Sequence, residues 1–180
     1  HGHRTAPHPV ARRAGRGAVA DDPLWWLTKD GDASCRDLAR RHYSAWKNKR
    51  PKLGLFVGPG EKIVLRTDAG DAVFVWRLAR YRADRQEGVE CTLFRNESPH
   101  LSSELIRQAD AIADHVWLGR RHYTFVDASA VRSSNPGFCF IAAGWRRCGQ
   151  TGRGRLILAR SPTRPAGDGD AARTEGAPCS

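Results

Sequence analysis

Val89-Glu90-Cys91-Thr92-Leu93-Phe94-Arg95-Asn96-Glu97-Ser98 is the segment on which the expected architecture rests. Its apolar start predicts a strand, and its polar end predicts a loop. Apolar residues then recur at helical spacing over about 102–116, which predicts an amphipathic helix that ends at Gly119. Ser102 or Ser103 is the expected N-cap of this helix. A second strand over 123–127 then completes a crossover connection in a mixed sheet.

Shorter elements surround this strand–helix–strand unit. Residues 34–42 predict a helix with Ser34 as its N-cap. A period of two predicts antiparallel strands at 53–57, 63–66 and 72–78. A short helix between Pro136-Gly137 and Gly144 precedes a closing pair of strands. The expected fold class is α+β, with a mixed, mostly antiparallel central sheet flanked by helices.

The composition predicts one folded domain between two tails. Residues 1–33 form a flexible N-terminal tail or arm, residues 34–160 the folded domain, and residues 161–180 a disordered tail, because both ends contain little apolar surface. No apolar run approaches the roughly 18 residues that span a bilayer, so we expect a cytoplasmic protein with no membrane partner. The five cysteines contain no CxxC pair and predict neither a zinc site nor a disulfide framework.

The positive charge lies on the expected domain. The net charge is +11, whereas residues 1–33 hold five basic and four acidic side chains and residues 161–180 hold two and three. Such a basic domain predicts a polyanionic partner, and nucleic acid is the commonest. The alternative is the arginine usage of a GC-rich genome. Short clusters of basic residues are the expected contacts to a phosphate backbone. They are Lys47, Lys49, Arg50, Arg120, Arg121, Arg146 and Arg147, with Arg153 and Arg155 beside the last hairpin.

Two polar clusters are candidate sites. His42-Tyr43-Ser44 ends the first helix, and histidine titrates near neutrality, so it is a candidate base; the alternative is an ordinary helix end with a cationic cap. Arg95-Asn96-Glu97 follows a central strand, where mixed sheets bind ligands, and the next helix offers free N–H groups for an anion. The alternative there is a solvated loop with Glu97 tied to Arg95.

Two further residues follow the second strand of the crossover. Asp127 closes that strand and enters the same cleft, or else it caps the next turn with Ser129. Asn135 begins the short helix and is a candidate contact for a donor or a base.

From His42 to Leu158 the order of these motifs resembles the phage Mom-type DNA modification proteins, a divergent branch of the GNAT acyltransferase superfamily. The matching motifs are short: His42-Tyr43-Ser44, the strand-turn over 56–59, Arg95-Asn96-Glu97, Ser102-Ser103, the strand over 124–127 and the segment 137–149. The resemblance covers about two-thirds of the chain and implies a GNAT-like sheet.

The resemblance implies a transferase that converts the exocyclic amine of adenine in DNA to a carbamoylmethyl-type derivative and so protects the DNA from restriction. It implies DNA and a small-molecule donor as partners in a bacterial or phage-infected cell. Its site residues would be catalytic His42, Tyr43, Ser44, Glu97 and Asp127, with Arg95, Asn96, Ser102, Ser103 and Asn135 binding substrate or donor. Iron is a possible cofactor, and His42 is its first candidate ligand.

The sequence departs from ordinary GNAT enzymes in two places. Their glycine-rich pyrophosphate loop is replaced by residues 95–101, which contain no glycine. The tyrosine that often acts as their general acid is replaced by Phe140. A coenzyme A-type donor is thus possible, but its loop is absent. Two alternatives stay open: a coenzyme A-dependent N-acetyltransferase acting on a small amine or a protein, and an inactive GNAT-like domain that binds nucleic acid.

Overall fold

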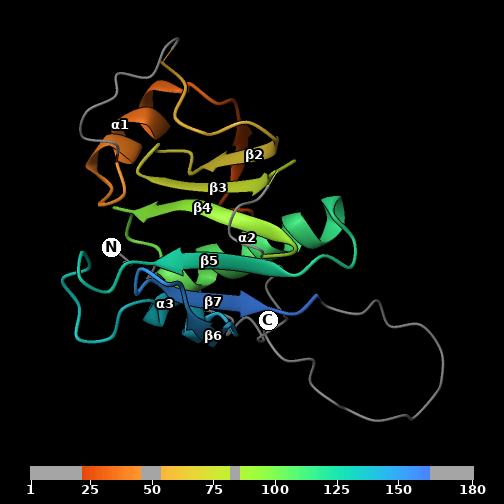
Figure 1. The fold of residues 1–180 in the computed structure, drawn as a ribbon. Helices are drawn as coiled ribbons and strands as arrows, with labels where there is room; N and C mark the ends of the chain where they lie inside the picture. The colour runs from red at the N-terminus through yellow and green to blue at the C-terminus, as the bar shows by residue number, and fades with distance from the viewer. Residues whose placement is uncertain (1–21, 46–53, 82–85, 163–180) are drawn as a thin grey trace, which may run out of the picture.

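The structure, a computed structural model, describes residues 22–45, 54–81 and 86–162 of the 180-residue chain. The elements, in order, are β1 (Trp26–Thr28), α1 (Ala33–Arg41), β2 (Glu61–Arg66), β3 (Ala72–Leu78), β4 (Val89–Asn96), α2 (Ser102–Val116), β5 (His122–Val126), α3 (Phe138–Ala142), β6 (Arg146–Gln150) and β7 (Leu156–Arg160). Within these residues the strands form one sheet in the order β1-β2-β3-β4-β5-β7-β6, shown in Figure 1. Only the β4–β5 pair is parallel. The predicted α+β fold class is confirmed.

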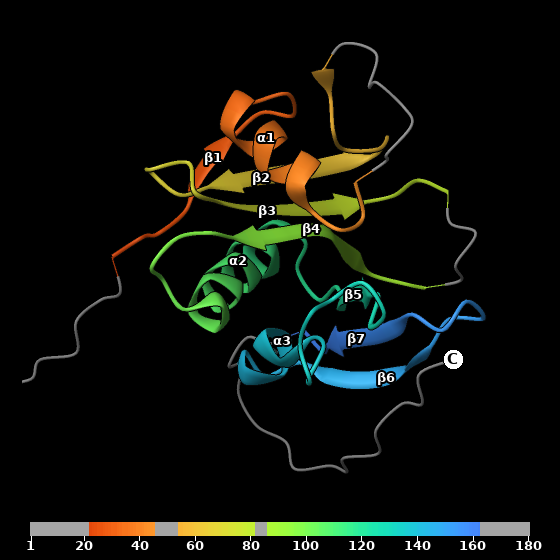
Figure 2. The same ribbon diagram turned by 90° about the vertical axis from the view of Figure 1, so that its left-hand side faces the viewer.

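The alternating side chains of β3 divide the core between the two faces of the sheet. Val73 and Val75 pack in one cluster with Leu38 of α1. Phe74 and Trp76 point to the other face, in a larger cluster to which α2 and α3 contribute. The Trp76 indole N–H donates to the carbonyl of Ala109 in α2 at 3.0 Å. α1 therefore covers one face of the sheet, and α2 and α3 lie together over the other, as Figure 2 shows.

β4 and β5 separate toward their carboxyl ends. Their parallel pairing runs only from Val89↔His122 to Cys91↔Thr124, although both strands continue further. At the point of separation, the Thr124 hydroxyl donates to the Cys91 carbonyl at 2.8 Å. On its other side β4 bulges against β3, because Trp76 faces Cys91 whereas Val75 faces Leu93. The carboxyl half of β4 thus has a strand partner on one side only.

The N-terminal region differs from the sequence prediction. Residues 54–57 of the strand predicted at 53–57 are not in the sheet, and residue 53 lies outside the described residues. The Asp30 carboxylate accepts the N–H groups of Phe56 and Val57 at 2.9 and 3.2 Å, which holds this segment as a loop over α1. β1 pairs with β2 instead, and Trp25 is buried, so the domain boundary drawn at residue 34 is too late. The tail segments 1–21 and 163–180 lie outside the described residues.

The helix caps also differ. Asp32, not Ser34, caps α1, since its carboxylate accepts the Cys35 N–H at 3.0 Å. The N-cap of α2 is Leu101, which makes no side-chain capping bond. The helix spans themselves follow the predicted apolar spacing, because burial against the sheet rather than the cap decides where these helices form.

A buried polar cluster joins α2 to the strands behind it. Asp110 of α2 is 2 % exposed, and its two carboxylate oxygens accept from His122 Nδ1 and Trp145 Nε1, each at 2.9 Å. Arg160 of β7 donates to Asp114, one turn further along α2, at 2.9 Å. The cluster fixes the long helix against β5 and β7. No helix in the described part of the chain is both long and apolar enough to cross a membrane.

Candidate functional site

A cleft of about 460 Å³ lies where β4 and β5 separate. Cys91, Thr92, Leu93 and Phe94 of β4 line it on one side and residues 124–127 on the other. Glu90 of β4 also lines it, and the remaining lining residues come from outside these strands: His42, Tyr43, Ser44, Val131, Gly137, Cys139, Phe140 and Arg155. A volume of this size is within the range of small-molecule sites. Of the predicted site residues, the fold thus brings His42, Tyr43, Ser44 and Asp127 together.

A double ion pair holds the end of α1 over this cleft. Arg41 binds both carboxylate oxygens of Glu97, at 3.0 and 2.8 Å. Arg95 donates to the same carboxylate at 2.6 Å and to the main-chain carbonyl of Arg41 at 2.7 Å. These contacts connect the last residue of α1 to the end of β4, and His42 follows directly. Arg95 and Glu97 therefore position the His42–Ser44 turn.

Glu97 is not placed as a catalytic base. Its carboxylate is engaged by two guanidinium groups, and the hydrogen bonds from Arg41 and then from Arg95 lower its pKa to about 2. It does not line the cleft, nor does Arg95. The alternative in which Glu97 is tied to Arg95 is the one that the structure has.

His42 is neutral in its position at the cleft. Ser44 contacts His42 Nδ1 through its hydroxyl at 2.7 Å and its main-chain N–H at 3.3 Å. Because the N–H must donate, Nδ1 accepts, and the proton of the neutral ring is assigned to Nε2. Burial and, to a lesser degree, the charge of Arg95 lower the His42 pKa from 6.5 to about 4. His42 therefore adds no positive charge to the end of α1 at neutral pH, where Arg40 and Arg41 are the basic residues of the last turn.

We expect the His42 ring to titrate near pH 4 instead of near 6.5. Because this folded-state pKa lies below the unfolded value, His42 stabilises the fold fully above pH 6.5, and this contribution is lost as the pH falls to about 4. Replacing Arg95 by Gln should raise the midpoint only partly, since burial is the larger cause. Histidine NMR titration, with His42→Ala to assign the signal, measures the midpoint; a value near 6.5 would contradict the assignment.

Tyr43 crosses the cleft from α1 to the end of β5. Its ring lies 4.2 Å from that of His42 between centroids, and its hydroxyl accepts the Asp127 N–H at 3.5 Å. Burial raises the pKa of the phenol above its ordinary value of 10.0. Tyr43 therefore keeps its proton at neutral pH and can donate it inside the cleft, whereas Phe140 cannot.

The Asp127 carboxylate closes the turn after β5. It accepts the Ser129 hydroxyl at 2.6 Å and the Ser129 N–H at 3.1 Å. These bonds, the side-chain bond foremost, lower the Asp127 pKa below its ordinary value. Asp127 lines the cleft, but its carboxylate has the capping role that the sequence also allowed, so its assignment as a base is not favoured.

The expected donor-binding residues lie outside the cleft. The Asn96 amide donates to the His100 carbonyl at 2.8 Å and to the Ser102 hydroxyl at 3.0 Å, and its oxygen accepts two bonds from Ser98. The loop before α2 is thus closed by its own side chains. Asn135 accepts from Arg147 at 2.7 Å. Asn96, Ser102, Ser103 and Asn135 are all absent from the cleft lining.

The expected DNA contacts fall into three groups: residues outside the described part of the chain, exposed arginines, and one arginine that contacts other protein groups. Lys47, Lys49 and Arg50 lie outside the described residues, whereas Arg120, Arg146 and Arg147 are exposed on the surface. Arg121 donates to the Gln86 side chain at 3.1 Å and to the Glu87 carbonyl at 3.2 Å. Among the arginines of the chain that the structure describes, Arg155 alone lines the cleft.

Sequence reasoning did not assign Arg155, Thr124, Cys139 or Gly137 to the site. Gly137 is favoured by its φ of 79°, which side-chain-bearing residues rarely adopt, and an added Cβ would also displace Leu158 Cδ1, which would lie 2.6 Å away. The sequence places Arg155 among the expected phosphate-backbone contacts, and only the pairing of β7 with β5 brings it to the cleft. The signal that the sequence offers for Arg155 is its position directly before the strand that begins at Leu156.

Among the described residues, no group of three or more His, Cys, Asp or Glu side chains is arranged to hold a metal ion. An iron site at His42 remains a prediction. No protein-family model, curated protein or solved structure matches this chain. The function is therefore argued from the geometry of the cleft.

Proposed function

We propose that this chain is a transferase that converts the exocyclic amine of adenine in DNA to a carbamoylmethyl-type derivative, as its resemblance to Mom-type proteins implies. One observation carries the proposal: the cleft between β4 and β5 contains a neutral histidine and a protonated tyrosine on one turn. A neutral imidazole can accept a proton, and a phenol that keeps its proton can donate one. Transfer of a group to an amine is accelerated by both, since the amine loses a proton and the leaving group gains one.

The reaction requires the adenine amine inside the cleft, so the base is flipped from the duplex or is already single-stranded. The amine nitrogen forms a bond to an electrophilic carbon of a small-molecule donor, and the bond from that carbon to its leaving group breaks. The proton lost by the amine passes to the Ser44 hydroxyl, which gives its own proton to His42 Nδ1 at 2.7 Å. Tyr43 protonates the leaving group.

A coenzyme A-dependent N-acetyltransferase acting on a small amine or a protein is the second candidate. The unpaired edge of β4 beyond Cys91 favours it, because an extended donor can form main-chain hydrogen bonds there. The loop over residues 95–101 disfavours it, since the side chains of Asn96 and Ser98 occupy the place of a glycine cradle.

The direct test is the nucleoside composition of DNA from bacteria that express the chain. We expect a new deoxyadenosine species by mass spectrometry in cells with the wild-type chain. We expect the same species with the control His115→Ala, because His115 is exposed on α2, and its loss with His42→Ala. Unmodified DNA from a folded, well-expressed wild-type chain would remove this function and favour the acetyltransferase or a binding module.

A further inference from the structure

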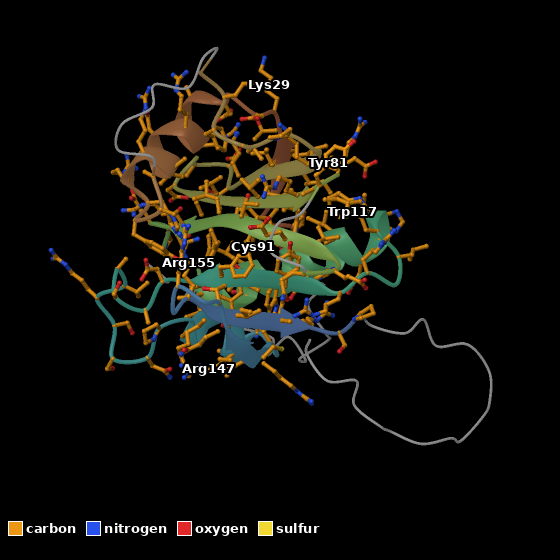
Figure 3. The ribbon with its side chains drawn as sticks, viewed as in Figure 1. Lys29, Tyr81, Cys91, Trp117, Arg147 and Arg155 are labelled. Carbon is orange, nitrogen blue, oxygen red and sulfur yellow. The ribbon has the colours of Figure 1, made fainter. Side chains whose placement is uncertain are left out.

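Arg155 lies at the mouth of the cleft. It precedes β7, whose first residue, Leu156, pairs with Val126 at the end of β5, so Arg155 lies beside Asp127. The Arg155 side chain is exposed and also lines the cleft. In Figure 3, Arg155 lies toward the carboxyl ends of β4 and β5, whereas Cys91 lies further back, where the strands are still paired.

The Arg155 charge faces the cleft without a carboxylate partner. Within residues 22–45, 54–81 and 86–162, no Asp or Glu oxygen lies within 4.0 Å of its guanidinium, whereas Arg41, Arg95 and Arg160 each have such a partner. Burial raises the pKa of Tyr43 and the Ser129 hydrogen bonds lower that of Asp127, while the charge of Arg155 is a smaller influence on both pKa values and so lies near both groups. The Asp127 carboxylate feels this charge but forms no ion pair with Arg155 within 4.0 Å, because it accepts hydrogen bonds from Ser129.

A main-chain donor lies on the residue beside Arg155, because Arg155 and Asp127 both adjoin the Leu156↔Val126 pair. The Asp127 N–H is 3.5 Å from the Tyr43 hydroxyl, which is at the long limit of a hydrogen bond. This N–H can therefore donate to a better acceptor. A guanidinium and a main-chain N–H at one position are the donors that proteins use to bind a phosphate oxygen.

We propose that Arg155 and the Asp127 main-chain N–H bind one phosphate of the nucleic acid strand, next to the base that enters the cleft. The proposal rests on the proposed function and specifies how its substrate is held. A phosphate of the strand fits this position because Arg155 is exposed at the mouth, where the backbone of an inserted nucleotide stays outside. The phosphate would hold the nucleotide in place while His42 and Tyr43 act on the base deeper in the cleft.

The test compares single-stranded oligonucleotides that contain one adenine. In two of them, the phosphate on the 5′ or the 3′ side of the adenine is replaced by an uncharged methylphosphonate. For the 180-residue wild-type chain, we expect one of the two replacements to weaken binding about tenfold and the other much less. Arg155→Gln should bind the unmodified oligonucleotide about tenfold more weakly and should no longer distinguish the sensitive replacement.

Arg153→Gln is the matched control, because it removes the same charge from the same turn but Arg153 does not line the cleft. It should keep the difference between the two methylphosphonates, whatever its overall affinity. Equal sensitivity to both replacements in the wild-type chain, or unchanged sensitivity in Arg155→Gln, overturns the proposal. So does an Arg155→Gln variant that binds DNA normally but has a raised KM for the donor, since the anion would then belong to the donor.

These outcomes separate the phosphate site from the proposed function. A chain that shows the Arg155-dependent phosphate effect but modifies no adenine keeps the site and loses the function. A chain that modifies adenine without any Arg155-dependent phosphate effect keeps the function and loses the site.

Discussion

Tyr43→Phe should lower the rate of adenine modification by about 10²–10⁴-fold, which is the usual contribution of a positioned general acid. The substitution removes only the hydroxyl, the single group of this side chain that can give a proton to the leaving group. The ring remains, so its packing against His42 at 4.2 Å is kept. The Tyr43 hydroxyl accepts only a 3.5 Å bond from the Asp127 N–H, so we expect little change in Tm.

Tyr81→Phe is the control for this prediction, since Tyr81 is 94 % exposed and lies away from the cleft. Its rate and Tm should match those of the wild-type chain. Single-turnover rates with saturating DNA separate the chemical step from binding. A Tyr43→Phe rate within about threefold of the wild-type rate, well below the usual effect, would assign proton donation to another group.

Asp110→Ala should lower the free energy of unfolding by about 2–6 kcal/mol, since each of two buried donors left without its acceptor costs about 1–3 kcal/mol. The reason is geometric. Asp110 is the acceptor for both the His122 ring and the Trp145 indole, so its removal leaves two donors buried without this partner. Arg160, whose Nε is 3.9 Å from the same carboxylate, loses part of its compensation as well.

Asp37→Ala is the matched control. It removes an aspartate from an exposed ion pair with Arg40, whose side chains are 64 % and 55 % exposed. Exposed pairs of this kind contribute about 0–1 kcal/mol. Urea unfolding measures both variants, and a loss below about 1 kcal/mol for Asp110→Ala would place the cluster among these weak pairs.

The second half of the fold could be predicted because its elements are long and periodic. The helix over 102–116 has the apolar spacing that its burial against the sheet requires. The strand expected at 53–57 has the same apolar appearance, yet Asp30 holds residues 56 and 57 as a loop. A carboxylate 26 residues away in the chain decided this, and local pattern carries no information about such a contact.

The candidate site shows the same limit. The sequence predicted a common site for His42, Tyr43 and Asp127, which all line the cleft. The prediction was possible because side chains that follow elements ending at the same edge of a sheet lie close together. The sequence did not show whether the carboxylates of Glu97 and Asp127 are free to act as bases. That depends on the side chains that donate to them, Arg41 and Ser129. The place of Arg155 depends on the register of β7, which no motif contains.

The separation of β4 from β5 has a consequence for self-association. An unpaired strand edge attracts strands of other chains, and proteins shorten or charge the edges that they expose. Among the described strands, the outer edge β1 has only three residues, and the other outer edge, β6, begins with two arginines. The inner edges face each other across a cleft that the end of α1 and α3 also enclose. The unpaired main-chain groups of β4 and β5 can thus bind a narrow ligand in the cleft but are not accessible to a strand of another sheet.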